Sequence, residues 1–177
     1  MNVLLFLVPM ALLLGLSGLA AGIRLAYYER DLGAKWPEVL DKVAGGGLAV
    51  GVGLGQDPAP ALLAVRGTDE AAVAEFYAAV LRIVDQEIAR AAGPDNPSPD
   101  ARLRRATHGG VETAHVGKDF HAARVGKAIL VSNKESVLHA AIGLKEADSL
   151  AKHKGPAAAK TFLGGDPLAW GWLDFAK

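Results

Sequence analysis

The sequence predicts an α+β domain that follows a long apolar segment at the N-terminus. Three observations support this fold class. The first 23 residues carry no charged side chain, short strand-like runs then occur in pairs around turns, and one later stretch repeats apolar residues at helical spacing. Strands that are joined in pairs by short turns favour a mainly antiparallel sheet, which the helical stretches would cover.

Length and composition narrow the class of protein. The 177 residues suffice for one domain of ordinary size and a leader. With 19 basic and 19 acidic side chains, the chain lacks the positive field that attracts nucleic acid, so we predict no nucleic-acid partner. The absence of cysteine excludes disulfides, thiolate metal sites and cysteine nucleophiles.

Residues 1–23 are predicted to target the chain to a membrane. As a helix, residues 3–23 would be about 30 Å long, which matches the hydrocarbon core of a bilayer. The small residues at 17–22 are typical of a cleaved signal peptide, which would export the domain to the cell envelope. If the segment instead remains as an anchor, the basic residues from Arg24 onward favour a body that faces the cytoplasm. A buried core helix is the third interpretation.

Residues 24–47 are predicted to form a helical connector to a domain at 48–177. Pro37 is typical of a helix start, because its missing N–H costs nothing in the first turn. Two strand-like runs, 48–55 and 61–66, then predict a hairpin. Glycines on one face of the first run predict that another element approaches it closely.

The clearest helix follows this hairpin. Thr68 and Asp69 are candidate N-caps, and apolar residues recur at three- and four-residue spacing as far as Ala92. Residues 93–100 contain three prolines and are predicted to form a loop.

A second hairpin is predicted from strands at 111–116 and 121–131. A capping box at Ser132, further helices including one at 149–162, and a strand at 168–175 follow. The predicted order after the N-terminal helix is therefore β-β-α-β-β-α-α-β, in which two successive ββα units suggest a degenerate repeat. An alternative interpretation is that the chain is an N-terminal fragment of a larger envelope protein.

Three segments of the second half carry a family resemblance: residues 126–136 (GKAILVSNKES), 148–151 (DSLA) and 167–174 (PLAWGWLD). They are similar to a strand-into-helix step, a helix start and a strand in a family of uncharacterised bacterial envelope proteins, in which a leader or anchor precedes repeated β-β-α modules. The likeness covers residues 111–177, and more loosely 40–177. It implies a location in the envelope, and it implies no catalytic residue.

Three histidines within fourteen positions, His108, His115 and His121, are candidates for a metal site. Imidazole and carboxylate groups are good ligands for zinc and similar ions. We expect His115 and His121 to face each other across the second hairpin, near Asp119 in its turn, whereas Glu112 should lie on the opposite face from His115. A small envelope hydrolase or metal-binding protein that uses these histidines is the alternative function, and ordinary surface histidines are the simpler interpretation.

Two further patterns match known motifs only in part. Residues 149–152 read S-x-x-K, but the companion S-D-N and K-T-G motifs are missing. Residues 51–55 (GVGLG) lack the following helix that a dinucleotide-binding loop requires. We therefore predict no catalytic and no cofactor-binding residues.

Two surface features favour an interaction role. The RLRR run at 102–105 is predicted to lie in a loop, where it would suit anionic lipid headgroups. Trp170 and Trp172 would share one face of the last strand, either as core or as a binding surface. Together with the leader, these features predict an exported or membrane-tethered, non-catalytic domain that has a structural or interaction role and a protein partner.

Overall fold

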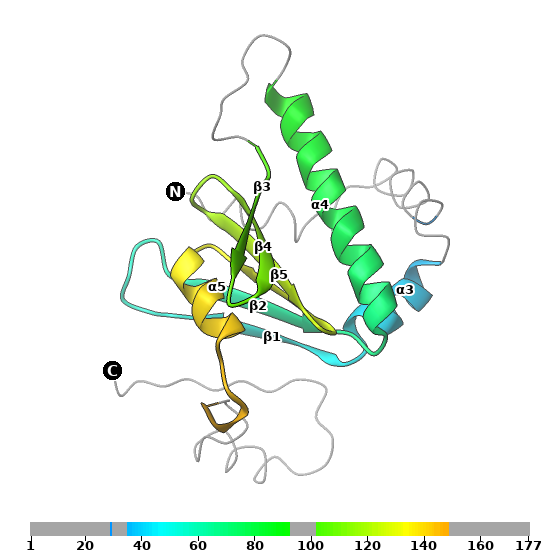
Figure 1. Ribbon diagram of the computed structural model, residues 1–177, viewed down its shortest axis with the longest axis horizontal. Coiled ribbons are helices and arrows are strands. Elements are labelled where there is room, and N and C mark those ends of the chain that lie inside the picture. The colour runs from blue at the N-terminus through cyan, green and yellow to red at the C-terminus, as the bar shows by residue number, and fades with distance from the viewer. Residues whose placement is uncertain (1–28, 30–34, 93–101, 149–177) are drawn as a thin grey trace. The chain divides into compact units, whose positions relative to one another are not determined.

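The computed structural model describes residue 29 and residues 35–92 and 102–148. The chain divides into two compact units, Met1–Ile142 and Gly143–Lys177. The described part of the first unit is an α+β domain with a six-stranded antiparallel sheet and three helices (Figure 1), so the predicted fold class and the antiparallel sheet are confirmed. The predicted N-terminal helix, the helix at 149–162 and the strand at 168–175 lie outside the described residues.

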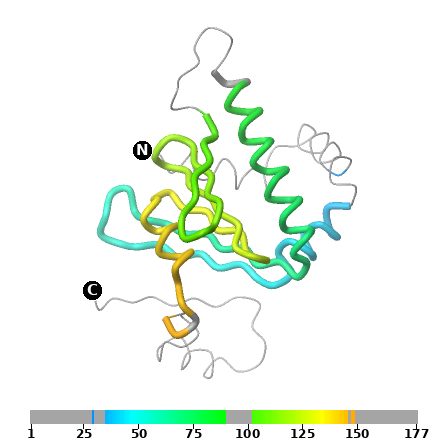
Figure 2. Tube along the Cα trace, viewed as in Figure 1, coloured from blue at the N-terminus to red at the C-terminus, as the bar shows by residue number. Residues whose placement is uncertain are grey.

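The strands lie in the sheet in the order β1-β2-β6-β5-β4-β3, and every neighbouring pair is antiparallel. Their bounds are Gly47–Val52 (β1), Ala61–Arg66 (β2), Arg104–His108 (β3), Val111–Val116 (β4), Phe120–Val125 (β5) and Ala128–Ser132 (β6). The strands β3 to β6 form a meander, and β6 then pairs with β2 of the first hairpin (Figure 2). As a result, β1 and β3 are the two edges of the sheet.

The helices are α3 (Trp36–Ala44), α4 (Glu70–Ala92) and α5 (Glu135–Ile142). Pro37 lies in the first turn of α3, as predicted. Of the two candidate caps of α4, Asp69 has this role, because its Oδ1 accepts the Ala72 N–H at 3.1 Å. This hydrogen bond lowers the pKa of Asp69. The Thr68 hydroxyl instead donates to the carbonyl of Asp41, at 3.2 Å, and so joins α4 to α3.

The sheet separates two hydrophobic clusters. One cluster lies under α3 and α4, and it includes Val73, Leu81 and Ile129. The other lies under α5, where Leu138 packs with Leu130. Neighbouring residues of β6 belong to different clusters because side chains alternate along a strand. The domain therefore has helices on both faces of one sheet.

Four strands connect α4 to α5 where the sequence predicts two. The arginine-rich run predicted as a loop enters β3, because Gly109 and Gly110, at φ 57° and 81°, form a two-residue turn between β3 and β4. The predicted strand at 121–131 is interrupted at Gly126, at φ 55°, and becomes β5 and β6. The observed order is β-β-α-β-β-β-β-α, so the described residues do not form two successive ββα units.

Two polar side chains at the end of β6 form hydrogen bonds with the backbone at the start of β2. Asn133 accepts the Ala61 N–H through Oδ1 and donates through Nδ2 to the Ala59 carbonyl, both at 2.8 Å. The Ser132 hydroxyl donates to the Ala61 carbonyl at 2.7 Å and accepts the Lys134 N–H at 3.1 Å. In the predicted capping box, the Ser132 hydroxyl would accept the N–H of Glu135. It instead accepts the N–H of Lys134, the residue before α5.

Candidate functional site

The strand β1 leaves one side of the sheet open. It pairs with β2 in a register that runs from Gly47 opposite Arg66 to Val52 opposite Ala61. No described strand pairs with its other side (Figure 1), and all six of its residues are exposed.

Large apolar side chains line one face of this edge strand. Leu48, Val50 and Val52, which we call the apolar stripe, are 63%, 59% and 55% exposed. They share the face that α3 and α4 cover further along the sheet, because Val50 pairs with Leu63, and Leu63 pairs with Val131 of that core. Apolar side chains that remain exposed together are typical of an interaction surface.

The backbone of the apolar stripe is directed toward the open edge. The Gly53 N–H donates to the Pro60 carbonyl at 2.8 Å, so Gly53 bonds toward β2. Hydrogen-bonded pairs alternate along an antiparallel ladder, and therefore the odd-numbered residues of β1 bond to β2. The N–H and C=O groups of the apolar stripe consequently point away from the sheet. The same alternation is found on the other side of β2, where the Gly67 N–H donates to the Lys127 carbonyl at 2.8 Å.

The opposite face of β1 carries only glycine and alanine. The close approach that the glycines of this run predicted is found at Gly53, just after β1, where a built Cβ would lie 2.8 Å from Cγ of Pro60. Within β1 it is not found, since no described atom lies within 4 Å of a Cβ built on Gly51. The reason is that α5 packs mainly on β5, β6 and β2, and so leaves β1 uncovered. Among the described residues, both faces of the edge strand are therefore exposed.

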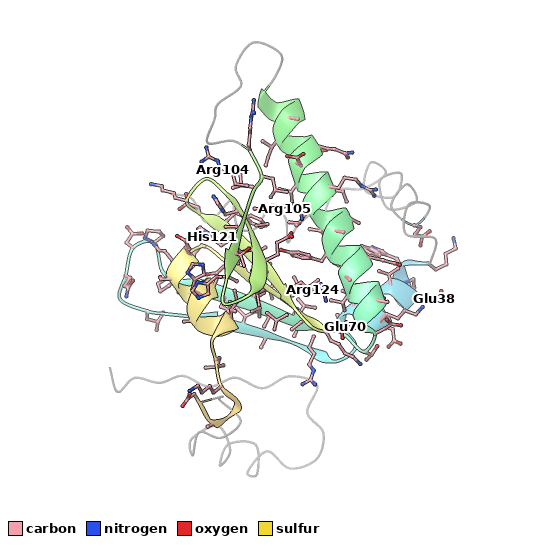
Figure 3. The ribbon with its side chains drawn as sticks, in the orientation of Figure 1. Glu38, Glu70, Arg104, Arg105, His121 and Arg124 are labelled. Carbon is pink, nitrogen blue, oxygen red and sulfur yellow. The ribbon has the colours of Figure 1, made fainter. Side chains whose placement is uncertain are left out.

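The strand at the other edge of the sheet carries charged side chains. Its strand, β3, carries Arg104 and Arg105, both exposed (Figure 3), and Arg105 forms an ion pair with Glu112 on β4. Charged side chains on an edge strand hinder pairing with another strand. In the part of the chain that the structure describes, the sheet thus has one charged edge and one edge that no strand pairs with.

The prediction that His115 and His121 face each other is confirmed. The two residues pair across β4 and β5, with their ring centroids 6.0 Å apart. The buried His121 donates its Nε2 proton to the Lys118 carbonyl at 3.0 Å, because a carbonyl can only accept. Glu112 lies on the opposite face, as predicted, where it meets Arg105.

His108 is not part of this pair. Its ring stacks on His139 of α5, with centroids 3.6 Å apart and planes 3° from parallel, and His139 Nε2 lies 3.8 Å from Glu135. Asp119 lines a hollow of about 480 Å³ together with His115, Arg104, Gly117 and Lys118. Within the part of the chain that the structure describes, no three His, Asp or Glu side chains are placed to hold a metal ion.

The remaining sequence motifs divide into two groups. Residues 51 and 52 end β1, and residues 53–55 lie in the turn after it, so the predicted glycine-rich strand extends only as far as Val52. The S-x-x-K pattern at 149–152 and the tryptophans Trp170 and Trp172 lie outside the described residues, as does the apolar segment at 3–23. No helix among the described residues is long and apolar enough to cross a membrane.

The hydroxyl group of Tyr77 in α4 is buried and has no hydrogen-bond partner among the described residues. Burial raises the pKa of Tyr77 to about 12, and Glu112 adds to this effect. Tyr77→Phe is expected to leave the stability at pH 7 unchanged or to increase it by up to about 1 kcal/mol, because the substitution removes an unpaired polar group. Urea unfolding of both proteins measures this difference.

The same residue predicts a loss of stability in alkali. Tyrosine titrates near pH 10 in an unfolded chain, so between pH 10 and 12 the unfolded state releases a proton that folded Tyr77 retains. The contribution of Tyr77 is complete below pH 10 and is lost as pH rises toward 12. From pH 8 to pH 11, the natural protein should lose more stability than Tyr77→Phe. An equal loss in both would contradict the assignment.

The chain matches no protein-family model, and comparisons with curated proteins and with solved structures give no match.

Proposed function

We propose that the domain is a non-catalytic binding module that takes up an extended segment of a partner by strand addition at β1. The observation that supports this most strongly is an uncharged edge strand whose six residues are all exposed, in a sheet whose opposite edge is charged. An added strand would bond to the backbone groups that the apolar stripe directs outward, and its side chains would pack beside the stripe.

We propose further that residues 1–23 bring this module to a membrane or into the cell envelope. The uncharged length of the segment and the resemblance of the second half to envelope proteins support this location. The intact mass of a C-terminally tagged chain from fractionated cells tests it. A mass that lacks about 20 to 22 residues, in an extracytoplasmic fraction, indicates a cleaved signal. A full-length chain in the membrane indicates an anchor, and a full-length chain in the soluble cytoplasmic fraction contradicts both.

Val50→Pro is expected to abolish strand addition and to preserve the fold. The substitution removes an outward N–H at the centre of the edge, and proline is tolerated on an edge strand at such a position. In the natural protein taken from cells, amide-resolved hydrogen exchange should be slow at Leu48 and Val52. Val50→Pro should accelerate exchange at these two amides by about tenfold or more, without affecting Ala49.

The matched control is Gly51→Pro. It removes an N–H that bonds to β2, and so it should accelerate exchange along the whole of β1. If the outward amides of the natural protein already exchange as fast as those of an unstructured peptide, the strand-addition proposal is wrong.

A metal-dependent function is the second candidate, because the strand register pairs His115 with His121, and His115 and Asp119 line one hollow. Since Nε2 of His121 is bonded to the Lys118 carbonyl, only its Nδ1 would be available to a metal. Zinc in the purified protein that is lost on His115→Ala would support this function. An unchanged melting temperature on addition of zinc, together with no bound metal, would exclude it.

A further inference from the structure

We infer that the strand completing the sheet at β1 is β1 of a second copy of this chain. This inference rests on the proposed strand addition and names its partner. Two β1 strands would run antiparallel about a twofold axis at Val50, so that one continuous sheet extends across both copies.

The strand is complementary to itself in this register. Val50 lies opposite Val50 of the other copy, and Leu48 lies opposite Val52. These are the residues whose N–H and C=O groups point outward, so each of these opposed pairs can exchange two hydrogen bonds. Residues that are opposite each other in an antiparallel pair share a face, and therefore the two apolar stripes merge into one. The glycine and alanine residues of both copies then share the other face.

Charge favours self-pairing at β1 and opposes it at β3. Residues 47–56 contain no charged side chain, so two copies meet without repulsion, and nothing on the strand selects a charged partner. Self-pairing of β3 about Ala106 would place Arg104 opposite His108 and Arg105 opposite Thr107, so that the arginines of both copies share one pair of strands. Pairing of β1 with itself is also closed by its twofold symmetry, so it yields a dimer and no open filament.

Lipid is a poorer occupant of the same surface. The apolar stripe by itself would suit a membrane, but its outward backbone groups would find no hydrogen-bond partner in hydrocarbon. A second strand satisfies both the side chains and the backbone. A contact of six residues per copy is short compared with a standard protein interface. Anchoring both copies in one membrane would raise their effective concentration, so the test is made on the full chain in membranes.

Cysteine crosslinking tests the arrangement, because the chain has no cysteine of its own. In the proposed register, Val50→Cys places two thiols on residues whose Cα atoms are about 5.5 Å apart, which suits a disulfide. Oxidation of membranes that carry this variant should give a thiol-sensitive band at twice the mass of the chain. The matched control is Ala106→Cys at the centre of β3, which should remain a monomer.

The register provides a second control. Leu48→Cys alone should not crosslink, because its two copies would be displaced by about 14 Å along the strands. Leu48→Cys mixed with Val52→Cys should crosslink. Equal crosslinking of Leu48→Cys and Val50→Cys would indicate random collision in the membrane and would overturn the dimer.

Failure of this inference is distinguishable from failure of the proposed function. If Val50→Cys remains monomeric while the amides of Leu48 and Val52 are protected from exchange, β1 pairs with a different segment, such as residues 3–23 or another protein. Strand addition then stands, and the second copy is excluded. If Val50→Cys remains monomeric and both amides exchange freely, both proposals are wrong.

Discussion

Gly67→Ala is expected to destabilise the domain by about 3 kcal/mol, because the junction between β2 and α4 has no room for a methyl group. A Cβ at this position would lie 2.3 Å from Cγ2 of Val73 and 2.5 Å from the carbonyl oxygen of Lys42. Val73 is completely buried, so its side chain cannot move aside. The Lys42 carbonyl accepts the Thr68 N–H at 2.8 Å, so α3 would have to separate from α4 to relieve the contact.

Urea unfolding of the full chain in one detergent buffer measures this effect, and Gly51→Ala is the matched control. Gly51 is exposed, and no described atom lies within 4 Å of a Cβ built on it. The control should change the free energy of unfolding by no more than about 0.5 kcal/mol. A loss below about 1 kcal/mol in Gly67→Ala would show that the junction opens at little cost, in disagreement with the observed packing.

The elements that could be predicted from the sequence are those with local signals. Pro37 begins α3, Asp69 caps α4, and the apolar period along α4 needs no knowledge of the rest of the fold. The strand β3 is not predicted from the sequence, because its arginines directly follow a proline-rich loop. The signal that could have found it is the Gly109–Gly110 pair, which is typical of a two-residue hairpin turn.

The open edge could not be predicted, because it depends on pairing between distant parts of the chain. The alternation of β1 is the same in a buried strand and in an exposed one. Its exposure follows from the order β1-β2-β6, in which Leu63 meets Val131 from the far end of the meander. For the same reason, the His115–His121 pair of a local hairpin was predictable, whereas the contact of His108 with His139 was not.

Leu138→Ala is expected to cost about 2–5 kcal/mol, because it empties the centre of the cluster under α5. Leu138 is 1% exposed and is the buried residue of an eight-residue helix, which is too short to be stable without packing. Urea unfolding measures the loss. Leu40→Ala is the control, since Leu40 on α3 is 46% exposed and its truncation should change stability by less than about 0.5 kcal/mol.

Hydrogen exchange in Leu138→Ala tests whether the two faces of the sheet are independent. The clusters under α4 and under α5 share no buried residue, because the sheet lies between them. We therefore expect the amides of α5 to exchange by local opening, while those around Leu81 in α4 exchange only by global unfolding. If the amides of both helices accelerate to the same extent, α5 is instead required for the whole sheet. The hydrogen bonds of Ser132 and Asn133 to the start of β2 would then explain the coupling, because both residues lie just before α5.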